Sequence, residues 1–278
     1  MASLQELRKR LRSIRSIEQL AGAMRTAATV KYSRLGRVRD GFSPYASAGA
    51  ELLRLLGTDG IARETESAQH RGCIIVFSGN RGLCGGFHTE LFRFLEKTLV
   101  SMPPPPLLLV GGRRAAAWLR ERGFSYEEFP VSDVPEYDEI RPIAARAMQL
   151  FISGEAGTVF VLFQHFCNML TQEPMMLQFL PDADAEKPEA ADGGELLFLP
   201  DRETVARQIA EFCLNARLYD LALECAAGAQ AATLMSMRSA CDNARTAAAD
   251  LEVTINRRRQ AEITSGVIET SAGAREAE

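Results

Sequence analysis

The sequence predicts an α/β protein in which a Rossmann-like α/β domain is inserted between two long terminal helices that pair as an antiparallel coiled coil. Two observations predict this fold. Near both ends of the chain, apolar residues recur at steps of three and four, which is the period of a helix that packs along one side. Between the ends, short apolar runs alternate with helical segments, as expected of a largely parallel sheet covered by helices.

The N-terminal segment is expected to be one helix from about Ser3 to Leu56. Pro44 is the first proline of the chain, so nothing stops the helix before it. At about 1.5 Å per residue, 40 residues would span roughly 60 Å, which is too long for a compact domain to cover. The apolar stripe comprises Leu4, Leu7, Leu11, Ile14, Ile17, Ala21, Met24, Ala28, Leu35, Val38 and Phe42, with Lys31 in its one gap.

The C-terminal segment is expected to form a second long helix after Pro200, the last proline. Its stripe shifts by one residue midway, and many of its positions are small, which lets two helices approach closely. We therefore expect the two terminal helices, residues 1–60 and 201–278, to pair with each other. The stripe comprises Ile209, Phe212, Ala216, Tyr219, Leu223, Ala226 and Gln230, followed by Leu234, Met237, Cys241, Ala244, Ala248, Leu251, Ile255 and Arg258.

The middle of the chain, residues 70–200, is expected to be the α/β domain. Apolar runs bounded by glycine, proline or polar residues predict its strands, and longer segments between them predict its helices. The expected strands are Cys73–Ser78, Leu107–Val110, Phe124–Phe129, Thr158–Gln164, Met175–Leu180 and Leu196–Leu199. The expected helices are Gly86–Val100, Arg113–Arg122 and Glu136–Ile152.

Composition excludes several classes of protein. The chain has 278 residues, of which 46% are hydrophobic, so it can form a core, and no apolar run is long enough to span a bilayer. No signal peptide is evident, so the chain is expected in the cytoplasm or held at the cytoplasmic side of a membrane by a partner. The six cysteines form no C-x-x-C pair and the three histidines form no H-E-x-x-H motif, so neither a metal nor a cofactor is expected.

Charge is distributed unevenly along the chain. Residues 1–40 contain ten Lys or Arg and three Asp or Glu, a net charge of about +7, whereas the whole chain carries −4. A basic helix on an acidic body indicates contact with an acidic partner or an anionic surface. Nucleic acid is not expected as the partner, because the first helix has almost no aromatic residues in its stripe and no recognition motif follows it.

A glycine-rich stretch, Ser78–Phe87, lies after a predicted strand and before a predicted helix, where many α/β folds bind phosphate. It matches neither G-x-x-x-x-G-K-[ST] nor G-x-G-x-x-G. We interpret it as a tight turn that packs the helix onto the sheet, and Cys84 as a structural thiol. A nucleotide-binding protein with coiled-coil arms remains the alternative.

Three consecutive arginines, Arg257–Arg259, lie near the end of the second helix. They project about 100° apart, so they cannot all face one coiled-coil partner. Arg258 also falls on the stripe, where an apolar residue is expected. A partner that surrounds the helix and simple solvation near a helix C-terminus both account for this pattern.

Four stretches, in order, resemble the gamma subunit of F-type ATP synthases. Leu11–Met24 is similar to the opening helix of that family, with its "SI…I…AM" spacing, and Ser78–Gly86 to its "S(D)RGLCGG" turn. Leu218–Ala244 resembles the segment that ends in Asp-Asn-Ala, and Asn256–Thr264 resembles the "N-x-x-R-Q-A-x-I-T" ending. The resemblance extends over nearly the whole chain.

The resemblance implies a central rotor shaft that couples ion flow through a membrane c-ring to ATP synthesis or hydrolysis. The terminal helices would turn inside a ring of alpha and beta subunits, and the α/β domain would form a foot against the epsilon subunit and the c-ring. Catalysis would take place on beta, so the chain alone is not an enzyme. It would lie at the cytoplasmic face of a bacterial or archaeal cell membrane, peripherally and through the complex only, without nucleic acid.

The family's functional residues match few positions of this chain. Met24 matches a methionine that faces beta, Asp242 and Asn243 match the Asp-Asn pair of the last helix, and Arg259, Gln260 and Thr264 match its contact segment toward beta. The turn at the head of the foot domain is matched by Arg81, Gly82, Cys84, Gly85 and Gly86.

The chain also departs from the family pattern. Asn80 stands where the family commonly has Asp, and Gly22 where it has Lys. Ala229 and Thr233 replace an acidic residue and an Arg, Ser265 and Gly266 replace Gln-Glu, and the tail from Ser271 is acidic. These departures indicate a divergent or alternative form of the family. A plain coiled-coil adaptor is a third interpretation, which the four ordered matches disfavour.

Overall fold

The computed structural model describes residues 3–56, 71–181 and 202–275. It has the expected α/β fold, with a long helix at each end and alternating strands and helices between them. The helices are α1 (Leu4–Leu56), α2 (Phe87–Ser101), α3 (Arg113–Glu121), α4 (Tyr137–Ile152) and α5 (Arg202–Arg275). The strands are β1 (Gly72–Phe77), β2 (Leu107–Gly111), β3 (Glu127–Phe129), β4 (Thr158–Phe166) and β5 (Gln172–Leu180).

The predicted elements agree with these bounds to within a few residues. The largest differences are at the starts of two strands: β5 begins at Gln172 where the sequence predicted Met175, and β3 begins at Glu127 where it predicted Phe124. The backbone N–H of Phe124 is bonded to the carbonyl of Leu119 at the end of α3, so it continues the helix terminus and does not join the sheet. The strand predicted at Leu196–Leu199 lies outside the described residues. No helix in the described ranges is long and apolar enough to cross a membrane.

Contacts divide the chain into two compact units. The first contains residues 1–27 and 234–278, and the second contains residues 28–233. α1 and α5 each contribute to both units, and the whole sheet belongs to the second.

The sheet of the second unit has the order β3-β2-β1-β4-β5. β1 is parallel to β2 and β4, β2 is parallel to β3, and β5 runs antiparallel to β4. The prediction of a largely parallel sheet is therefore confirmed. All six residues of the central strand β1 are buried, as expected for a strand that is covered on both faces.

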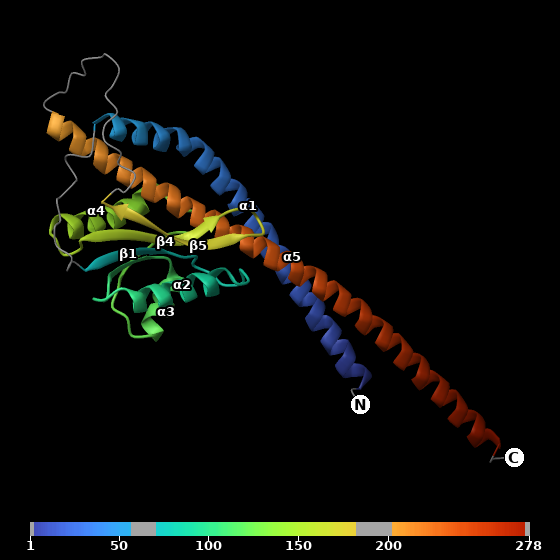
Figure 1. Ribbon diagram of the computed structural model, residues 1–278. Helices are drawn as coiled ribbons and strands as arrows, with labels where there is room; N and C mark the ends of the chain where they lie inside the picture. Colours follow the sequence, from blue (N-terminus) through green and yellow to red (C-terminus); the bar gives the residue numbers. More distant parts are fainter. Residues whose placement is uncertain (1–2, 57–70, 182–201, 276–278) are drawn as a thin grey trace. The chain divides into compact units, whose positions relative to one another are not determined.

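The second unit has three layers (Figure 1). One face of the sheet packs against α2 and α3, through Ile74 and Val76 of β1. The other face, which carries Cys73 and Ile75, packs against α4, α5 and the middle of α1. The alternation along β1 thus sends neighbouring side chains into two separate cores.

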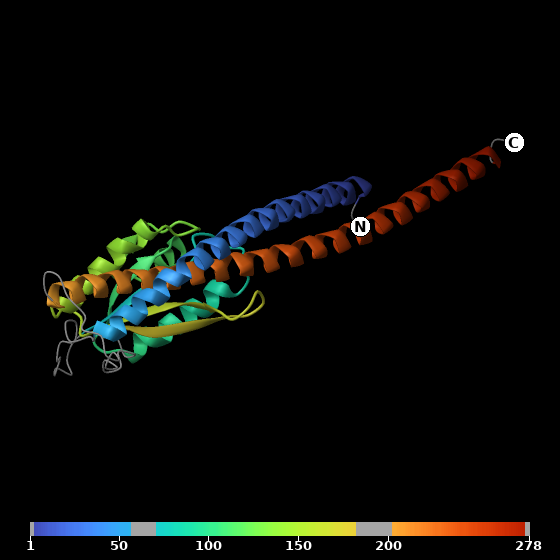
Figure 2. The same ribbon diagram turned by 90° about the horizontal axis from the view of Figure 1, so that it is seen from above.

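In the first unit, α1 and α5 run in opposite directions (Figure 2), and their pairing is antiparallel. Ala21 of α1 packs against Met237 and Cys241 of α5. Ion pairs flank this seam, between Glu18 and Arg245 at 2.7 Å and between Arg15 and Glu252 at 2.5 Å. The expected coiled-coil pairing of the terminal helices is confirmed.

Two positions of the predicted stripes were wrong. Ile17 is 56% exposed, and the neighbouring Glu18 faces α5 in its place, since Arg245 binds its carboxylate. Phe212 is 42% exposed, whereas Cys213 is buried and donates to the carbonyl of Gly49 on α1. A straight helix drifts by about 20° per heptad, so neighbouring residues exchange places along a seam.

α5 has two parts with different environments. From Cys213 to Ala231 most of its positions are buried, on every side of the helix, because α1 covers one side and the sheet and α4 cover another. Between residues 238 and 268, the part after Met237 whose burial is described, only Cys241, Ala244, Ala248 and Ile255 are buried, which is the narrow stripe of a helix pair. The sequence predicted a single stripe in both parts, so it missed the second buried face of the first part.

Candidate functional site

The glycine turn, residues 78–86, connects β1 to α2. Leu83 (φ 66°) and Gly85 (φ 59°) adopt left-handed backbone conformations, which reverse the chain within a few residues. The side chain of Leu83 is 59% exposed, whereas Cys84 is buried and burial raises the pKa of its thiol. Cys84 therefore has the environment of a structural thiol, not of an activated nucleophile.

The turn residues predicted as functional differ in exposure. Arg81 has a side chain that is 76% exposed, and it lies 3.6 Å from the carboxylate of Asp133. Its backbone carbonyl faces Nε2 of His88 at 3.0 Å. Gly85 and Gly86 are exposed, and Gly82 is partly buried. The turn thus presents an arginine and a leucine to solvent.

Asn80 holds the turn against the neighbouring loops. Its Nδ2 donates to the carbonyl of Val131 at 2.8 Å and to Oδ1 of Asp133 at 3.2 Å. Its Oδ1 accepts from the backbone N–H of Arg113 at 3.1 Å. An aspartate at this position would lack the two donated bonds and would face a second carboxylate. Asn80, which departs from the family pattern, is therefore the residue that can donate a hydrogen bond to Asp133.

The N-terminus of α3 is already saturated by the protein. The N–H of Arg113 bonds to Asn80, that of Arg114 to the carbonyl of Gly79, and that of Ala115 to Oγ of Ser78 at 3.0 Å. These are the donors that a phosphate would need at a helix N-terminus.

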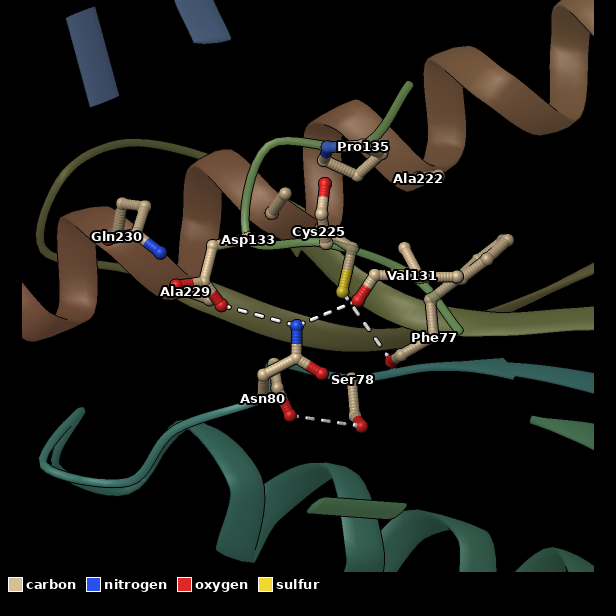
Figure 3. A pocket seen from close by; sticks show the side chains of 13 residues that line it. Phe77, Ser78, Asn80, Val131, Asp133, Pro135, Ala222, Cys225, Ala229 and Gln230 are labelled. Atoms are coloured by element: carbon tan, nitrogen blue, oxygen red, sulfur yellow. Dashed lines mark hydrogen bonds between the residues drawn. The ribbon is translucent and has the colours of Figure 1, made fainter. Parts of the chain in front are cut away.

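α5 occupies the place where this type of sheet usually binds ligands. The strand order reverses between β1 and β4, and ligands bind at the carboxyl ends of such strands. Here Cys225 of α5 donates to the carbonyl of Phe77, the last residue of β1, at 3.5 Å (Figure 3). A Cβ added to Gly79 would lie 3.6 Å from Cβ of Ala229.

The cavity that remains beside Cys225 has a volume of about 20 Å³, enough for about one water molecule. Asn80, Asp133 and Gln230 are among its lining residues (Figure 3). Burial raises the pKa of Cys225 to about 12, so its thiol stays protonated. A nucleotide does not fit in this crevice.

A wider, open hollow of about 690 Å³ lies at the ends of β1, β2 and β3. Arg81 and Arg113 line it together with the carboxylates of Glu128, Asp133 and Glu139. These acidic groups disfavour a triphosphate, because like charges close to a ligand weaken its binding.

Met24, Asp242 and Asn243 belong to the first unit. Met24 is partly buried and packs against the core formed by Ala21, Met237 and Cys241. Asp242 and Asn243 are exposed, and Asp242 lies 3.8 Å from Arg245 one turn later. Met24 therefore contributes to the seam between the two helices, whereas Asp242 and Asn243 point outward.

Arg259, Gln260 and Thr264 are all exposed on the last turns of α5. Every position from 259 to 268 is exposed, including Ile263 at 55% and Ile268 at 61%. The hydroxyl of Thr264 donates to the carbonyl of Gln260. The structure brings these three residues together on one short stretch of helix, in a different unit from the glycine turn.

The sequence analysis missed a buried ionic cluster in the second unit. Glu224 of α5, whose side chain is 8% exposed, accepts from Nη2 of Arg39 at 2.9 Å and is bonded to Nδ1 of His165 at 2.6 Å. The backbone N–H of Phe166 also donates to it at 3.0 Å. The available signal was one carboxylate inside the apolar run Leu221–Ala229, because buried charges require partners.

Arg39 of α1 serves a second carboxylate in the same cluster. Its Nε donates to Oδ1 of Asp220 at 3.1 Å. Burial alone would lower the pKa of Arg39, but the hydrogen bonds and charges of Asp220 and Glu224 outweigh burial and raise it. Arg39 therefore stays charged, and the cluster joins α1, α5 and β4.

The sequence analysis also did not predict an ion pair between Lys31 of α1 and Asp133. Burial alone would raise the pKa of Asp133, but bonds from Lys31 and Asn80 and the charge of Arg81 outweigh it and lower the pKa. The signal in the sequence was Lys31 itself, since it filled the gap in an apolar stripe. The charged position marks where α1 contacts the α/β domain.

Comparisons with known proteins agree with this architecture. A family model described as ATP synthase matches residues 3–276. The ATP synthase gamma chain of Desulfitobacterium hafniense is 30% identical, with 99% of each chain covered, and that of Rubrobacter xylanophilus is 29% identical over 99% of this chain and 98% of the relative.

Solved structures show the same fold. A chain from the Euglena gracilis mitochondrial ATP synthase, solved with OSCP, F1 and the c-ring, matches with a TM-score of 0.67 at 16% identity, covering 96% of this chain and 91% of that one. A chain from a structure of the rotor of the same enzyme matches with a TM-score of 0.64 at 16% identity, covering 94% and 98%. With a family model and relatives that span nearly its whole length, this chain belongs to the ATP synthase gamma-chain family.

Proposed function

We propose that this chain is the central rotor shaft of an F-type ATP synthase. It couples ion flow through a membrane c-ring to ATP synthesis or hydrolysis on the beta subunits by rotation. The chain supplies no catalytic group of its own. Family membership supports this role, as does the pairing of the two terminal helices beside a compact α/β domain.

The observation that carries the proposal is the exposed end of α5. A helix in water normally hides its apolar residues on one face, but here Ile263 and Ile268 are both more than half exposed. Arg259 and Gln260 lie on the same turns. An exposed helix end with apolar and cationic side chains on several sides suits a collar of surrounding subunits better than a single partner helix.

We assign the functional parts as two shaft segments, residues 1–60 and 201–278, and a foot domain, residues 70–200. Alpha and beta subunits would surround the shaft, with Met24, Arg259, Gln260 and Thr264 at or near the contacts with beta. The epsilon subunit and the c-ring would bind the foot, and Arg81, Gly82, Cys84, Gly85 and Gly86 form its head turn. The complex would hold the chain peripherally at the cytoplasmic face of a bacterial or archaeal membrane.

Coupling in this account depends on asymmetry. The surface of a two-helix shaft differs around its axis, so each beta subunit meets different side chains as the shaft turns. A conformational equilibrium shifts only by the difference in contact free energy between its states. The exposed surface of α5 carries Asp242 and Asn243 on one stretch of the helix and Arg259 on another. Contacts with side chains of such different charge would differ in free energy.

The alternative, a nucleotide-binding protein with coiled-coil arms, is disfavoured by two observations. Cys225 and Ala229 of α5 fill the crevice at the end of β1. The N-terminal donors of α3 are bonded to Ser78, Gly79 and Asn80. Both features remove places where a phosphate would bind.

Purification of the tagged chain from native membranes tests the proposal. We expect alpha, beta and epsilon subunits to copurify with ATPase activity, at about one copy of this chain per three alpha–beta pairs, the stoichiometry that the family resemblance implies. Arg259→Ala and Gln260→Leu should lower coupled ATP synthesis and leave the foot domain folded, whereas Arg93→Ala on the exposed surface of α2 serves as the matched control. Recovery of the lone chain bound to a nucleotide would contradict the proposal.

A further inference from the structure

Glu224 is the meeting point of three elements in the second unit. Its carboxylate takes one bond from α1, through Arg39, and two from β4, through the ring of His165 and the N–H of Phe166. Its side chain is 8% exposed, so water competes little with these bonds. Charge-assisted bonds of this kind are directional and about twice as strong as neutral ones.

The part of α5 that directly follows Glu224 buries only small side chains. From residue 225 to residue 231 the buried positions are Cys225, Ala227, Gly228, Ala229 and Ala231, whereas the larger buried side chains precede Glu224 and are Leu214, Leu218, Tyr219, Leu221 and Leu223. Ridges of long side chains normally fit into grooves of the neighbouring helix and fix its rotation. Small residues give shallow ridges, and apolar contact has no preferred direction. After Glu224, apolar packing alone therefore resists rotation of α5 about its own axis only weakly.

We propose that Glu224 is a positioning residue that fixes the rotational register of α1 and α5 on the α/β domain. The two hydrogen bonds from β4 prevent α5 from rotating relative to the sheet. The bond from Arg39 keeps α1 in a fixed position relative to α5. This inference rests on the proposed rotor function, in which torque must pass between the α/β domain and the helix pair without slip.

Asp220 is the weaker member of the cluster. Its side chain is 29% exposed, and Arg39, to which it is ion-paired, also binds Glu224. It lies one turn before Glu224, and within the described parts of the chain it makes no hydrogen bond to β4. Loss of Asp220 should therefore loosen α1 only, whereas loss of the Glu224 charge should loosen α1 and the sheet together.

The test uses the complete membrane complex in vesicles, where ATP hydrolysis and ATP-driven ion pumping are measured on the same sample. Glu224→Gln keeps the shape of the side chain and removes its charge. We expect ions pumped per ATP hydrolysed to fall at least threefold, while the rate of hydrolysis stays within twofold. Glu211→Gln, an exposed glutamate on the same helix, is the matched control and should pump like the wild type.

Redox-controlled locks separate slipping from a general loss of structure. A Cβ added to Gly49 would lie 3.1 Å from Sγ of Cys213, a distance suited to a disulfide, so Gly49→Cys can join α1 to α5. Gly79→Cys with Ala229→Cys would place two Cβ atoms 3.6 Å apart and join α5 to the turn after β1. Under oxidising conditions these locks should restore pumping in Glu224→Gln, and a reductant should abolish the rescue.

The outcomes are distinguishable. If Glu224→Gln pumps as many ions per ATP as the wild-type complex, the inference is wrong and the rotor function stands. The same holds if pumping per ATP is lowered in Glu224→Gln and neither disulfide restores it. If the active wild-type complex lacks this chain, the proposed function itself fails. If Glu224→Gln does not assemble, the same ratio is measured for His165→Gln, which removes one bond from β4, and an unchanged ratio there overturns the inference.

Discussion

Lys31 of α1 forms an ion pair with Asp133, in the loop between β3 and α4. The pair is partly buried, with side chains 31% and 19% exposed. It explains a charge in the middle of an apolar stripe, because at this point α1 lies against the loops of the α/β domain. Asp133 also accepts from Asn80 and lies near Arg81, so one carboxylate connects α1 to the glycine turn.

Replacing Lys31 by Met should destabilise the second unit. Asp133 would keep Asn80 but lose its main cation, and a buried polar group that loses a partner costs about 1–3 kcal/mol. Fluorescence of Trp118, the single tryptophan, reports on this unit during urea unfolding, because its ring packs against Phe92 at 5.3 Å. Adding Asp133→Asn should recover part of the loss, and Lys9→Ala on the exposed face of α1 should change nothing. Equal stability of Lys31→Met and wild type would contradict this account.

Asn80→Asp restores the residue that the family commonly has, yet we expect it to weaken this chain. It removes the bond to Val131 and places two carboxylates together, at an expected loss of about 1–3 kcal/mol. The double variant with Asp133→Asn should be more stable than Asn80→Asp alone, which a double-mutant cycle with Trp118 fluorescence would measure. If the two changes in unfolding free energy were additive, the side chains at positions 80 and 133 would not interact.

His88 should make the stability of the second unit depend on pH. Burial lowers its pKa, against the opposing bond to the carbonyl of Arg81, and the charge of Arg114 lowers the pKa further. Because the folded pKa lies below the ordinary value of 6.5, the unfolded chain binds more protons just below that pH. The free energy of unfolding should therefore fall as the pH drops below about 6.5, until the folded pKa is reached.

The variant His88→Phe retains an aromatic ring beside Phe92 and removes the titrating group. The difference in unfolding free energy between wild type and variant, measured by urea unfolding from pH 7.5 to 5, should shrink or change sign as the pH falls. A difference that is constant across this range would show that His88 does not contribute.

One of the six thiols should react quickly in the folded chain. Cys167, in the turn between β4 and β5, is exposed, and the other five cysteines are buried. Burial raises the pKa of Cys73 to about 12 and that of Cys213 to about 11, so at pH 8 they hold almost no thiolate. A chromogenic disulfide reagent should titrate one thiol in the native chain and six in guanidinium. Cys167→Ser should abolish the fast phase, and a fast phase that survives this change would refute the assignment.

The exposed end of α5 should be needed for assembly and not for folding. Ile263→Asp places a charge on a residue that is 55% exposed, so the isolated chain should keep its helix content and its Trp118 fluorescence. Binding to alpha and beta subunits should weaken at least tenfold, measured by the amount of complex recovered at fixed subunit concentrations. Glu262→Asp, a conservative change on the neighbouring exposed residue, is the control. Normal assembly of Ile263→Asp would argue against a collar at this position.

The elements that the sequence predicted best are those that depend on local pattern. The seam of α1 follows from residues three and four apart, and the strands follow from apolar runs beside glycine and proline. Cys84 was interpreted from its surroundings in the chain, and its burial agrees. The family resemblance added the candidate functional residues, which no pattern of period or charge would have identified.

The elements that the sequence could not predict depend on partners distant in the chain. Glu224 is 59 residues from His165, and Asn80 is 53 residues from Asp133. The two-sided burial of α5 depends on the sheet that it crosses. Ile17 and Glu18 were exchanged because Arg245 on the other helix decides which of them faces the seam. These outcomes are set by packing, not by local preference.

The central claim is that this chain turns inside its complex. With the beta subunits fixed to a surface and a bead attached through the exposed Cys167, ATP is added and the bead is followed by microscopy. The account predicts sustained rotation in one direction, at a rate that follows ATP hydrolysis and stops when ATP is exhausted. Beads that stay fixed while the same complexes hydrolyse ATP would contradict it.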